Sequence, residues 1–266
     1  TLETQKEKFN EALNDFVNNA TMYSSEYERE KYVNDYIISN CVYDDEAAYN
    51  NKTQGNVSTA YGVLVDGKAI CEGYARAFQL LCNKLGIECV SIAGMTGDVG
   101  HEWNCAKTWN DSQDDFSNYY YFNLTDEQMY SSHRADDLFD EIEPDNYNND
   151  ENLIGNLYVP ECNSTEYNYY NQTAPILYAF DEENDNTISN ALANSAVNGD
   201  NYFNIIVDDS LDFEDAYSTL VQDGYVVNYI ESTNNMLWGE VELDTSSYAY
   251  KNDTLRVITI VLNYIN

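Results

Sequence analysis

One segment constrains the fold of this chain more than any other: a run of apolar residues with helical spacing that begins at a cysteine. Intervals of three and four separate its apolar positions, which predicts one buried helical face. Gly67 completes a turn before this helix, and Gly86 is expected to end it. Cys71 therefore falls in the first helical turn, where unpaired N–H groups and the helix dipole are expected to lower the pKa of its thiol. The apolar positions are Cys71, Tyr74, Ala75, Phe78, Leu81, Cys82 and Leu85.

Downstream of this helix, the alternation of apolar and polar residues predicts short strands. Glu88 to Ala93 forms the first, Gly94 to Gly100 is expected to be a glycine-rich turn, and His101 to Lys107 forms the second. Successive side chains of a strand point to opposite faces, so His101, Trp103 and Cys105 share one face.

A third strand is predicted from Asn118 to Leu124, with Asn123 on the same face as two tyrosines. If this strand pairs antiparallel with its neighbour, Asn123 can orient His101. A base beside a nucleophile, with a third group that holds the base, is the general arrangement of an activated nucleophile.

Several short motifs carry a family resemblance. They are Tyr61-Gly62-Val63-Leu64, Gly67, Cys71-Glu72-Gly73-Tyr74-Ala75 and His101-Glu102-Trp103-Asn104, with Ile37-Ile38 and Tyr43-Asp44 upstream. Together they resemble the core of the transglutaminase-like superfamily, within the papain-like group of cysteine-dependent acyl-transfer folds. The resemblance covers Thr59 to Thr125 and, with the upstream pairs, roughly the first half of the chain.

The resemblance implies an α+β papain-like fold in which a helix bearing the nucleophile packs on an antiparallel sheet. It implies Cys71 as nucleophile, His101 as general base and then acid, and Asn123 as the orienting group. The backbone N–H of Cys71 is expected to supply one oxyanion donor and the Tyr61 hydroxyl a second. Trp103 is expected on the substrate side of the site.

One position departs from the family pattern. The family's third residue is usually Asp in an Asp-x-Thr strand, whereas this chain has Asn123-Leu124-Thr125. Papain-like enzymes use Asn in this role, although a neutral amide stabilises imidazolium less than a carboxylate does. Asp126 is the nearest alternative, and an apparent insertion from Trp109 to Asn118 precedes the strand.

The remaining cysteines and the second histidine have plainer interpretations. Cys82, Cys89 and Cys105 are expected in the core, because buried cysteine commonly acts as a small apolar residue. His133 lies in a polar stretch and is expected at the surface. No closely paired ligands of the C-x-x-C type indicate a metal site, and no phosphate-binding or dinucleotide motif occurs. We therefore expect no metal and no cofactor.

The balance of basic and acidic residues limits the classes of partner that the chain can bind. The chain has 12 basic and 47 acidic residues, for a formal charge of -35. Nucleic acid is excluded as a partner because phosphate contacts need Lys and Arg. Acidic runs such as residues 181–185 are expected to be solvated turns, since none has the pattern of a calcium-binding loop. No apolar stretch approaches the roughly 20 residues of a membrane span.

The composition and the first residue, Thr1, lead us to expect an extracellular or cell-surface protein of bacterial type whose signal peptide has been removed. Its partner would be a protein or peptide substrate, with cell-wall peptide as one candidate. The spacing of the cysteines does not indicate a disulfide framework.

Three regions are predicted. Residues 1–142 hold two helices, Thr4 to Asn19 and Ser24 to Ser39, and the transglutaminase-like core; residues 143–173 form a connecting segment; residues 174–266 form a smaller α+β domain. In the last, helices are predicted at Ile188 to Val197 and Leu211 to Gln222, and strands at Tyr202 to Val207, Tyr225 to Ile230, Leu237 to Leu243 and Leu255 to Tyr264, with a turn at Asn234-Asn235.

Two functions of different class remain after these steps. The first is cysteine-dependent acyl transfer on amide bonds through a thioester, with water as acceptor in a peptidase or amidase and a lysine amine as acceptor in a crosslinking enzyme. The second is a non-catalytic surface module for adhesion or binding, built on a degenerate domain of the same family. Hydrolysis is the simpler expectation, because it requires no second protein site.

Overall fold

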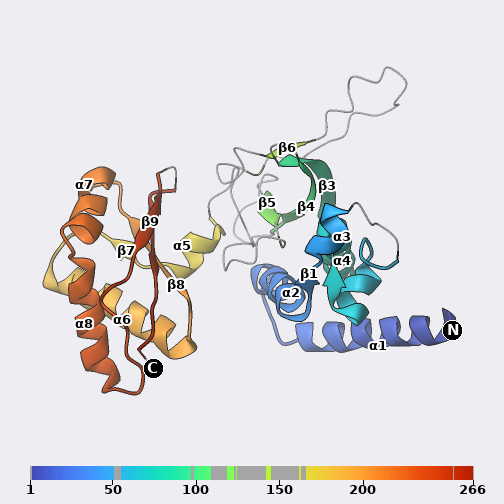
Figure 1. Cartoon of the computed structure of the whole chain (residues 1–266), viewed down its shortest axis with the longest axis horizontal. Helices are drawn as coiled ribbons and strands as arrows, with labels where there is room; N and C mark the ends of the chain where they lie inside the picture. The colour runs from blue at the N-terminus through green and yellow to red at the C-terminus, as the bar shows by residue number, and fades with distance from the viewer. Residues whose placement is uncertain are drawn as a thin grey trace. The chain divides into compact units, whose positions relative to one another are not determined.

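The computed structural model describes residues 2–50, 55–96, 99–108, 119–122, 124, 142–144, 162, 166–253 and 255–265. The chain divides into two compact units, residues 1–169 and 170–266 (Figure 1). This boundary falls inside 143–173, the segment predicted to connect two domains. Each unit combines helices with a four-stranded, mainly antiparallel sheet, so the predicted α+β class is confirmed. No helix in the described part of the chain is both long and apolar enough to cross a bilayer.

Two helices open the first unit. Helix α1 runs from Leu2–Ala20 and α2 from Glu26–Asn40, close to the predicted bounds. The start of α2 is fixed by a reciprocal capping pair, in which the Ser25 side chain accepts the Glu28 N–H while the Glu28 carboxylate accepts the Ser25 N–H. Phe16 of α1 and Ile37 of α2 are fully buried, so both helices contribute to the core beside α4.

A short parallel pairing leads into the helix that carries Cys71. Strand β1 (Val42–Tyr43) precedes the short helix α3 (Asp45–Tyr49) and the π-helical turn η1 (Gly62–Asp66), and β2 (Lys68–Ala69) then pairs with β1. Tyr43 lies opposite Ala69 in this pairing, two residues before Cys71. Helix α4 follows as Cys71–Lys84, as the apolar spacing predicts.

Gly73 shows why the motif needs glycine in the first turn of α4. A Cβ atom built at this position would lie 2.4 Å from the Val57 carbonyl oxygen and 2.8 Å from the Ala69 Cβ. The same Val57 carbonyl accepts the Ile70 N–H at 3.0 Å. The segment before α4 therefore packs directly on the helix backbone, and this packing fixes where Cys71 begins the helix.

The sheet of the first unit has the order β5-β4-β3-β6, with antiparallel neighbours throughout. The predicted turn at Gly94 to Gly100 is wrong: Gly94 pairs with His101, and Thr96 pairs with Val99, so both strands continue into it. Glycine has no side chain, so the alternation of apolar and polar residues cannot be recognised at Gly94 and Gly100 in the sequence. The strands are β3 (Cys89–Thr96), β4 (Val99–Lys107), β5 (Tyr119–Phe122) and β6 (Ile142–Pro144).

Helix α4 packs on β3 and β4 through its predicted apolar face. Phe78 of α4 meets Phe122 of β5 with ring centroids 4.6 Å apart, and both are fully buried. Cys82 and Cys89 are buried in the same core, as predicted. The nucleophile-bearing helix is therefore held against the sheet that carries His101.

The second unit differs from prediction in two of its four predicted strands. Tyr225 to Ile230 was predicted as a strand, but Tyr225 is the N-cap of helix α8 and the rest of the segment lies in that helix, as does the predicted turn at Asn234-Asn235. The buried positions Val226, Tyr229, Ile230 and Thr233 follow helical spacing, which β-branched and aromatic residues had disguised as a strand. The strand predicted from Leu237 to Leu243 is also wrong, since only Leu243 forms a bridge, with Tyr264.

The acidic run at 181–185 also differs from prediction. Asp181 caps helix α6 by accepting the Asn184 N–H, and the acidic residues after it occupy the first turn, where the helix dipole favours them. The strand order is β7-β8-β10-β9. The elements are α5 (Tyr169–Thr173), β7 (Ile176–Leu177), α6 (Glu182–Asn198), β8 (Tyr202–Val207), α7 (Phe213–Tyr217), η4 (Ser218–Gln222), α8 (Val226–Leu237), β9 (Ala249–Asn252) and β10 (Val257–Val261).

Candidate active site

Cys71 is the first residue of α4 and differs from the other cysteines in exposure. Its side chain is partly exposed, whereas the other five cysteines are buried. Ile70 precedes it in an extended conformation, and the Ile70 carbonyl accepts the N–H groups of Gly73 and Tyr74. The thiol therefore lies at the open N-terminal end of a helix of 14 residues. This is the position in the helix that the sequence predicts for Cys71.

The hydrogen-bond pattern of β4 explains what meets this thiol. The Lys107 N–H donates to the Glu88 carbonyl, so alternation turns the N–H groups of Glu102 and Asn104 away from β3 and toward β5. The described pairing with β5 ends where Phe122 lies opposite Asn104. The Glu102 N–H, beyond that last described pair, acts on the Cys71 sulfur. The Cys71 sulfur thus lies near β4 at Glu102, the residue that follows His101 in the chain.

The electrostatics of Cys71 correct one prediction. Burial raises the pKa of the Cys71 thiol above its ordinary value, although the backbone N–H groups of Glu102 and Glu72 and the hydroxyl of Tyr43 act in the opposite direction. The Glu102 carboxylate raises it further. The predicted lowering by the helix terminus is therefore outweighed by desolvation. The resting side chain is a thiol, and its chemistry requires a base.

Tyr43 is the site residue that sequence reasoning missed. Burial raises the pKa of Tyr43 to about 12, and the charge of Cys71 adds to this, while the Cys71 backbone N–H acts in the opposite direction. The Tyr43 hydroxyl therefore lies near the backbone N–H and the sulfur of Cys71. Its ring is positioned by β1 and lies 6.1 Å from that of Tyr74. The Tyr43-Asp44 pair in the family resemblance was the available signal.

Tyr61, predicted as the second oxyanion donor, is placed differently. Its ring stacks on Phe9 of α1 at 6.0 Å between centroids. It lines a pocket of about 480 Å³ with residues of α1, Asn56 and Thr59. The described contacts of Tyr61 therefore lie with α1, and Tyr43 occupies the position beside the Cys71 N–H.

His101 and Trp103 share one face of β4, as predicted. The half-buried His101 imidazole stacks on the Trp103 indole, with ring centroids 5.9 Å apart and planes inclined by 18°. Trp103 is only 2% exposed and packs with Ile92 and Cys105. The Trp103 indole was predicted on the substrate side of the site. In the structure it lies in the core and supports the His101 imidazole from there.

The opposite face of β4 carries polar side chains toward α4. The Asn104 amide donates to the Ala75 carbonyl of α4 at 3.0 Å, and the Ser91 hydroxyl donates to the Glu102 carboxylate at 3.0 Å. Burial raises the pKa of Glu102, the Ser91 hydrogen bond opposes this, and the charge of Glu72 adds to it. These contacts fix the register between the helix of Cys71 and the strand of His101.

Three residues named from the sequence lie outside the described residues: Asn123, its alternative Asp126, and His133. The orienting role of Asn123 stays a prediction. Within the described residues, no three side chains of His, Cys, Asp or Glu gather as a metal site would require.

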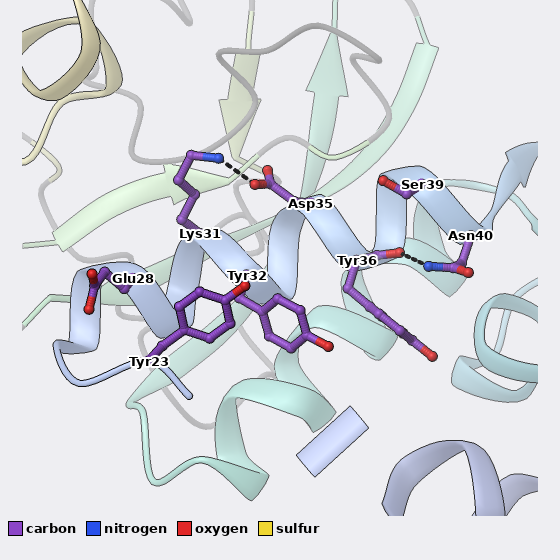
Figure 2. A pocket seen from close by; sticks show the side chains of 8 residues that line it. All are labelled: Tyr23, Glu28, Lys31, Tyr32, Asp35, Tyr36, Ser39 and Asn40. Atoms are coloured by element: carbon purple, nitrogen blue, oxygen red, sulfur yellow. Dashed lines mark hydrogen bonds and ion pairs between the residues drawn. The ribbon is translucent and has the colours of Figure 1, made fainter. Parts of the chain in front are cut away.

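A separate pocket of about 430 Å³ lies along α2 (Figure 2). Tyr23 and Tyr32 stack at its edge with ring centroids 4.8 Å apart, and Lys31 forms an ion pair with Asp35. None of the predicted catalytic residues lines this pocket, so it is distinct from the Cys71 site.

Comparison with known proteins matches the part of the chain that contains Cys71 and His101. A family model described as the transglutaminase-like superfamily matches residues 14–123. Kyphoscoliosis peptidase from Mus musculus is 27% identical over an alignment of 167 residues that covers 54% of this chain and 24% of the mouse protein. The chain thus spans about a quarter of this relative's length.

Two solved structures also resemble the chain. One is a TGase, with 19% identity, a TM-score of 0.36 and coverage of 47% of this chain and 32% of the other. The second is a candidate cysteine protease from Cytophaga hutchinsonii, with 15% identity, a TM-score of 0.35 and coverage of 44% and 37%. The family match includes Cys71 and His101 and spans the elements from α2 to β5 of the first unit. Residues 14–123 therefore belong to a transglutaminase-like superfamily domain.

Proposed function

We propose that the first unit is a cysteine-dependent acyltransferase that hydrolyses amide bonds of a protein or peptide. The observation that carries this proposal is the meeting of Cys71, at the start of α4, with β4 at the residue next to His101. A partly exposed cysteine at a helix terminus, near a strand whose next residue is a histidine, supplies the two groups that nucleophilic catalysis uses. The family match supports the same class of chemistry.

His101 has to act as general base, because burial raises the pKa of the Cys71 thiol and keeps it protonated at rest. The imidazole takes the thiol proton as sulfur attacks the amide carbon. It then returns the proton to the leaving amine as the C–N bond breaks, which leaves a thioester. Water attacks the thioester with the same imidazole as base, and the carboxylic acid leaves.

The oxyanion of each tetrahedral intermediate needs donors beside the sulfur. The Cys71 backbone N–H is one such donor, and in the resting site it is directed to the Tyr43 oxygen. The substrate carbonyl oxygen takes over this N–H, and the Tyr43 hydroxyl, which also lies near the sulfur, becomes the second donor. Tyr43 thus replaces Tyr61 in the predicted role.

The experiment is to trap the thioester. The chain is incubated with peptides that carry side-chain amides, cell-wall peptides among them, and hydroxylamine is added to intercept the acyl group as a hydroxamate. Hydroxamate that forms with the parent and is absent with Cys71→Ala supports the proposal. Incorporation of ¹⁸O from labelled water identifies water as acceptor, and its suppression by a lysine analogue identifies crosslinking instead.

The rival function is a non-catalytic surface module. It is the better interpretation if no peptide yields a hydroxamate and if Cys71 reacts with alkylating reagents no faster than a free thiol of the same pKa. For either function we propose a location outside the cell or on its surface, from the low lysine content and the many Asn, Tyr and Asp residues.

A further inference from the structure

Two cysteines that are far apart in the sequence meet in the core of the first unit. The sulfur atoms of Cys105 and Cys162 lie 3.3 Å apart, although the residues are 57 positions apart in the chain. Both side chains are fully buried. Contact between two thiols over this sequence distance brings together the two groups that a disulfide requires.

The surroundings of the pair connect it to the active site. Cys105 lies on β4 on the same face as Trp103 and His101, and it packs with Trp103, Ile92 and Cys162 in one apolar cluster. A covalent bond at Cys105 would therefore anchor residue 162 to the strand that presents the catalytic imidazole.

We propose that Cys105 and Cys162 form a disulfide. The bond requires the sulfur atoms to approach to about 2.05 Å, a movement of about 1.3 Å from their present contact. The oxidant is a small-molecule disulfide such as oxidised glutathione. One protein thiolate attacks it and expels a thiol, and the second then attacks the mixed disulfide and expels another. Two protein thiols lose two protons and two electrons, and the oxidant becomes two thiols.

The burial of both sulfur atoms places this reaction in the folding of the chain. The exchange takes place before Cys162 packs against β4, and the completed bond is then shielded from reductants by the same packing. The other buried cysteines make different contacts: the Cys41 and Cys89 thiols each lie 3.8 Å from a backbone carbonyl oxygen. Cys82 interacts with Cys89, which makes that pair the alternative linkage to exclude.

The first test maps the linkage in the full chain. The protein is folded in a glutathione redox buffer and denatured with N-ethylmaleimide. It is then digested without reduction by a protease that cleaves at acidic residues, since Glu88 separates Cys82 from Cys89. Mass spectrometry is expected to find the Cys105 and Cys162 peptides joined and lacking two hydrogens. Labelling of both as free thiols, or a Cys82–Cys89 linkage in their place, overturns the proposal.

The second test measures what the bond does to stability. The parent, unfolded with reductant and refolded in its presence, is expected to have a thermal midpoint roughly 5 to 15 °C below that of the oxidised protein, as the loss of a disulfide across a loop of this length would produce. The double variant Cys105→Ala/Cys162→Ala should lose this response to reductant, and Cys41→Ala, a buried cysteine elsewhere, should keep it. A parent whose midpoint is the same with and without reductant contradicts the proposal.

Discussion

The hydroxyl of Tyr43 is expected to set the pH at which Cys71 becomes reactive, and Tyr43→Phe removes it with little change in shape. Three donors favour the Cys71 thiolate: the N–H groups of Glu102 and Glu72, and this hydroxyl. A hydrogen bond to a charged group contributes roughly 1.5–3 kcal/mol. Because both side chains are partly exposed, water replaces some of the lost bond, and we take the lower end of that range.

At about 1.36 kcal/mol for each pKa unit, this loss raises the pKa of Cys71 by about one unit. The thiolate population at neutral pH then falls about tenfold, while the more basic thiolate is intrinsically about threefold more reactive, for a Brønsted slope near 0.45. Tyr43→Phe should therefore react about threefold more slowly than the parent at neutral pH and about threefold faster above both pKa values. The two pH–rate curves should cross.

The assay follows the thione released from an aromatic disulfide reagent as it reacts with the native protein. Cys71→Ala gives the background from the five buried cysteines. Tyr61→Phe decides between the two tyrosines, and Tyr36→Phe is a control on α2, where the Tyr36 ring packs on Phe16 and Tyr32. Curves for the parent and Tyr43→Phe that superimpose would refute the reasoning, as would a shift of the Cys71 pKa that appears in Tyr61→Phe instead.

Four further outcomes are expected. Peptide mapping after brief alkylation at neutral pH should find Cys71 labelled first among the six cysteines, and equal labelling of any buried one argues against the site. His101→Ala should abolish turnover in the thioester assay, because it removes the base, while the chain still unfolds in a cooperative thermal transition. Asn123→Ala should slow turnover by roughly ten- to a thousand-fold, about 1.4 to 4 kcal/mol, while Asn123→Asp retains or improves it. Burial raises the pKa of the Glu30 carboxyl well above 4.5. The contribution of this carboxyl to stability is therefore complete below pH 4.5 and is lost as the pH rises. Glu30→Gln should raise the thermal midpoint at neutral pH but not in acid.

The parts of the fold that the sequence predicts well are those with a strong local period. The helix from Cys71–Lys84 has apolar residues on one face over several turns, and Tyr202–Val207 is a strand at its predicted bounds. In α8 the local pattern misleads, because Val226, Tyr229 and Ile230 satisfy the composition of a strand while their burial follows a helix. Propensity alone does not decide between these two states.

The missed contacts are non-local. Tyr43 lies near Cys71 because β1 pairs in parallel with β2. Each of these strands has only two residues, so the pairing leaves no periodic signal in the sequence. Cys162 reaches Cys105 from a stretch that lacks any periodic pattern, and its complete burial could not be inferred from its neighbours. Both contacts depend on how separate segments pack, and neither residue's own segment contains that information.

The pKa of Cys71 shows how such packing changes a chemical conclusion. The helix terminus is a local feature, and it favours a thiolate. Burial and the neighbouring Glu102 carboxylate arise from packing on β4, and their sum raises the pKa instead. A preformed thiolate–imidazolium pair is therefore not the resting state we infer, and proton transfer from Cys71 to His101 accompanies attack. The acylation step, followed in a single turnover, should accordingly slow in heavy water because the thiol proton moves as the sulfur attacks, and an absence of that isotope effect would restore the ion-pair mechanism.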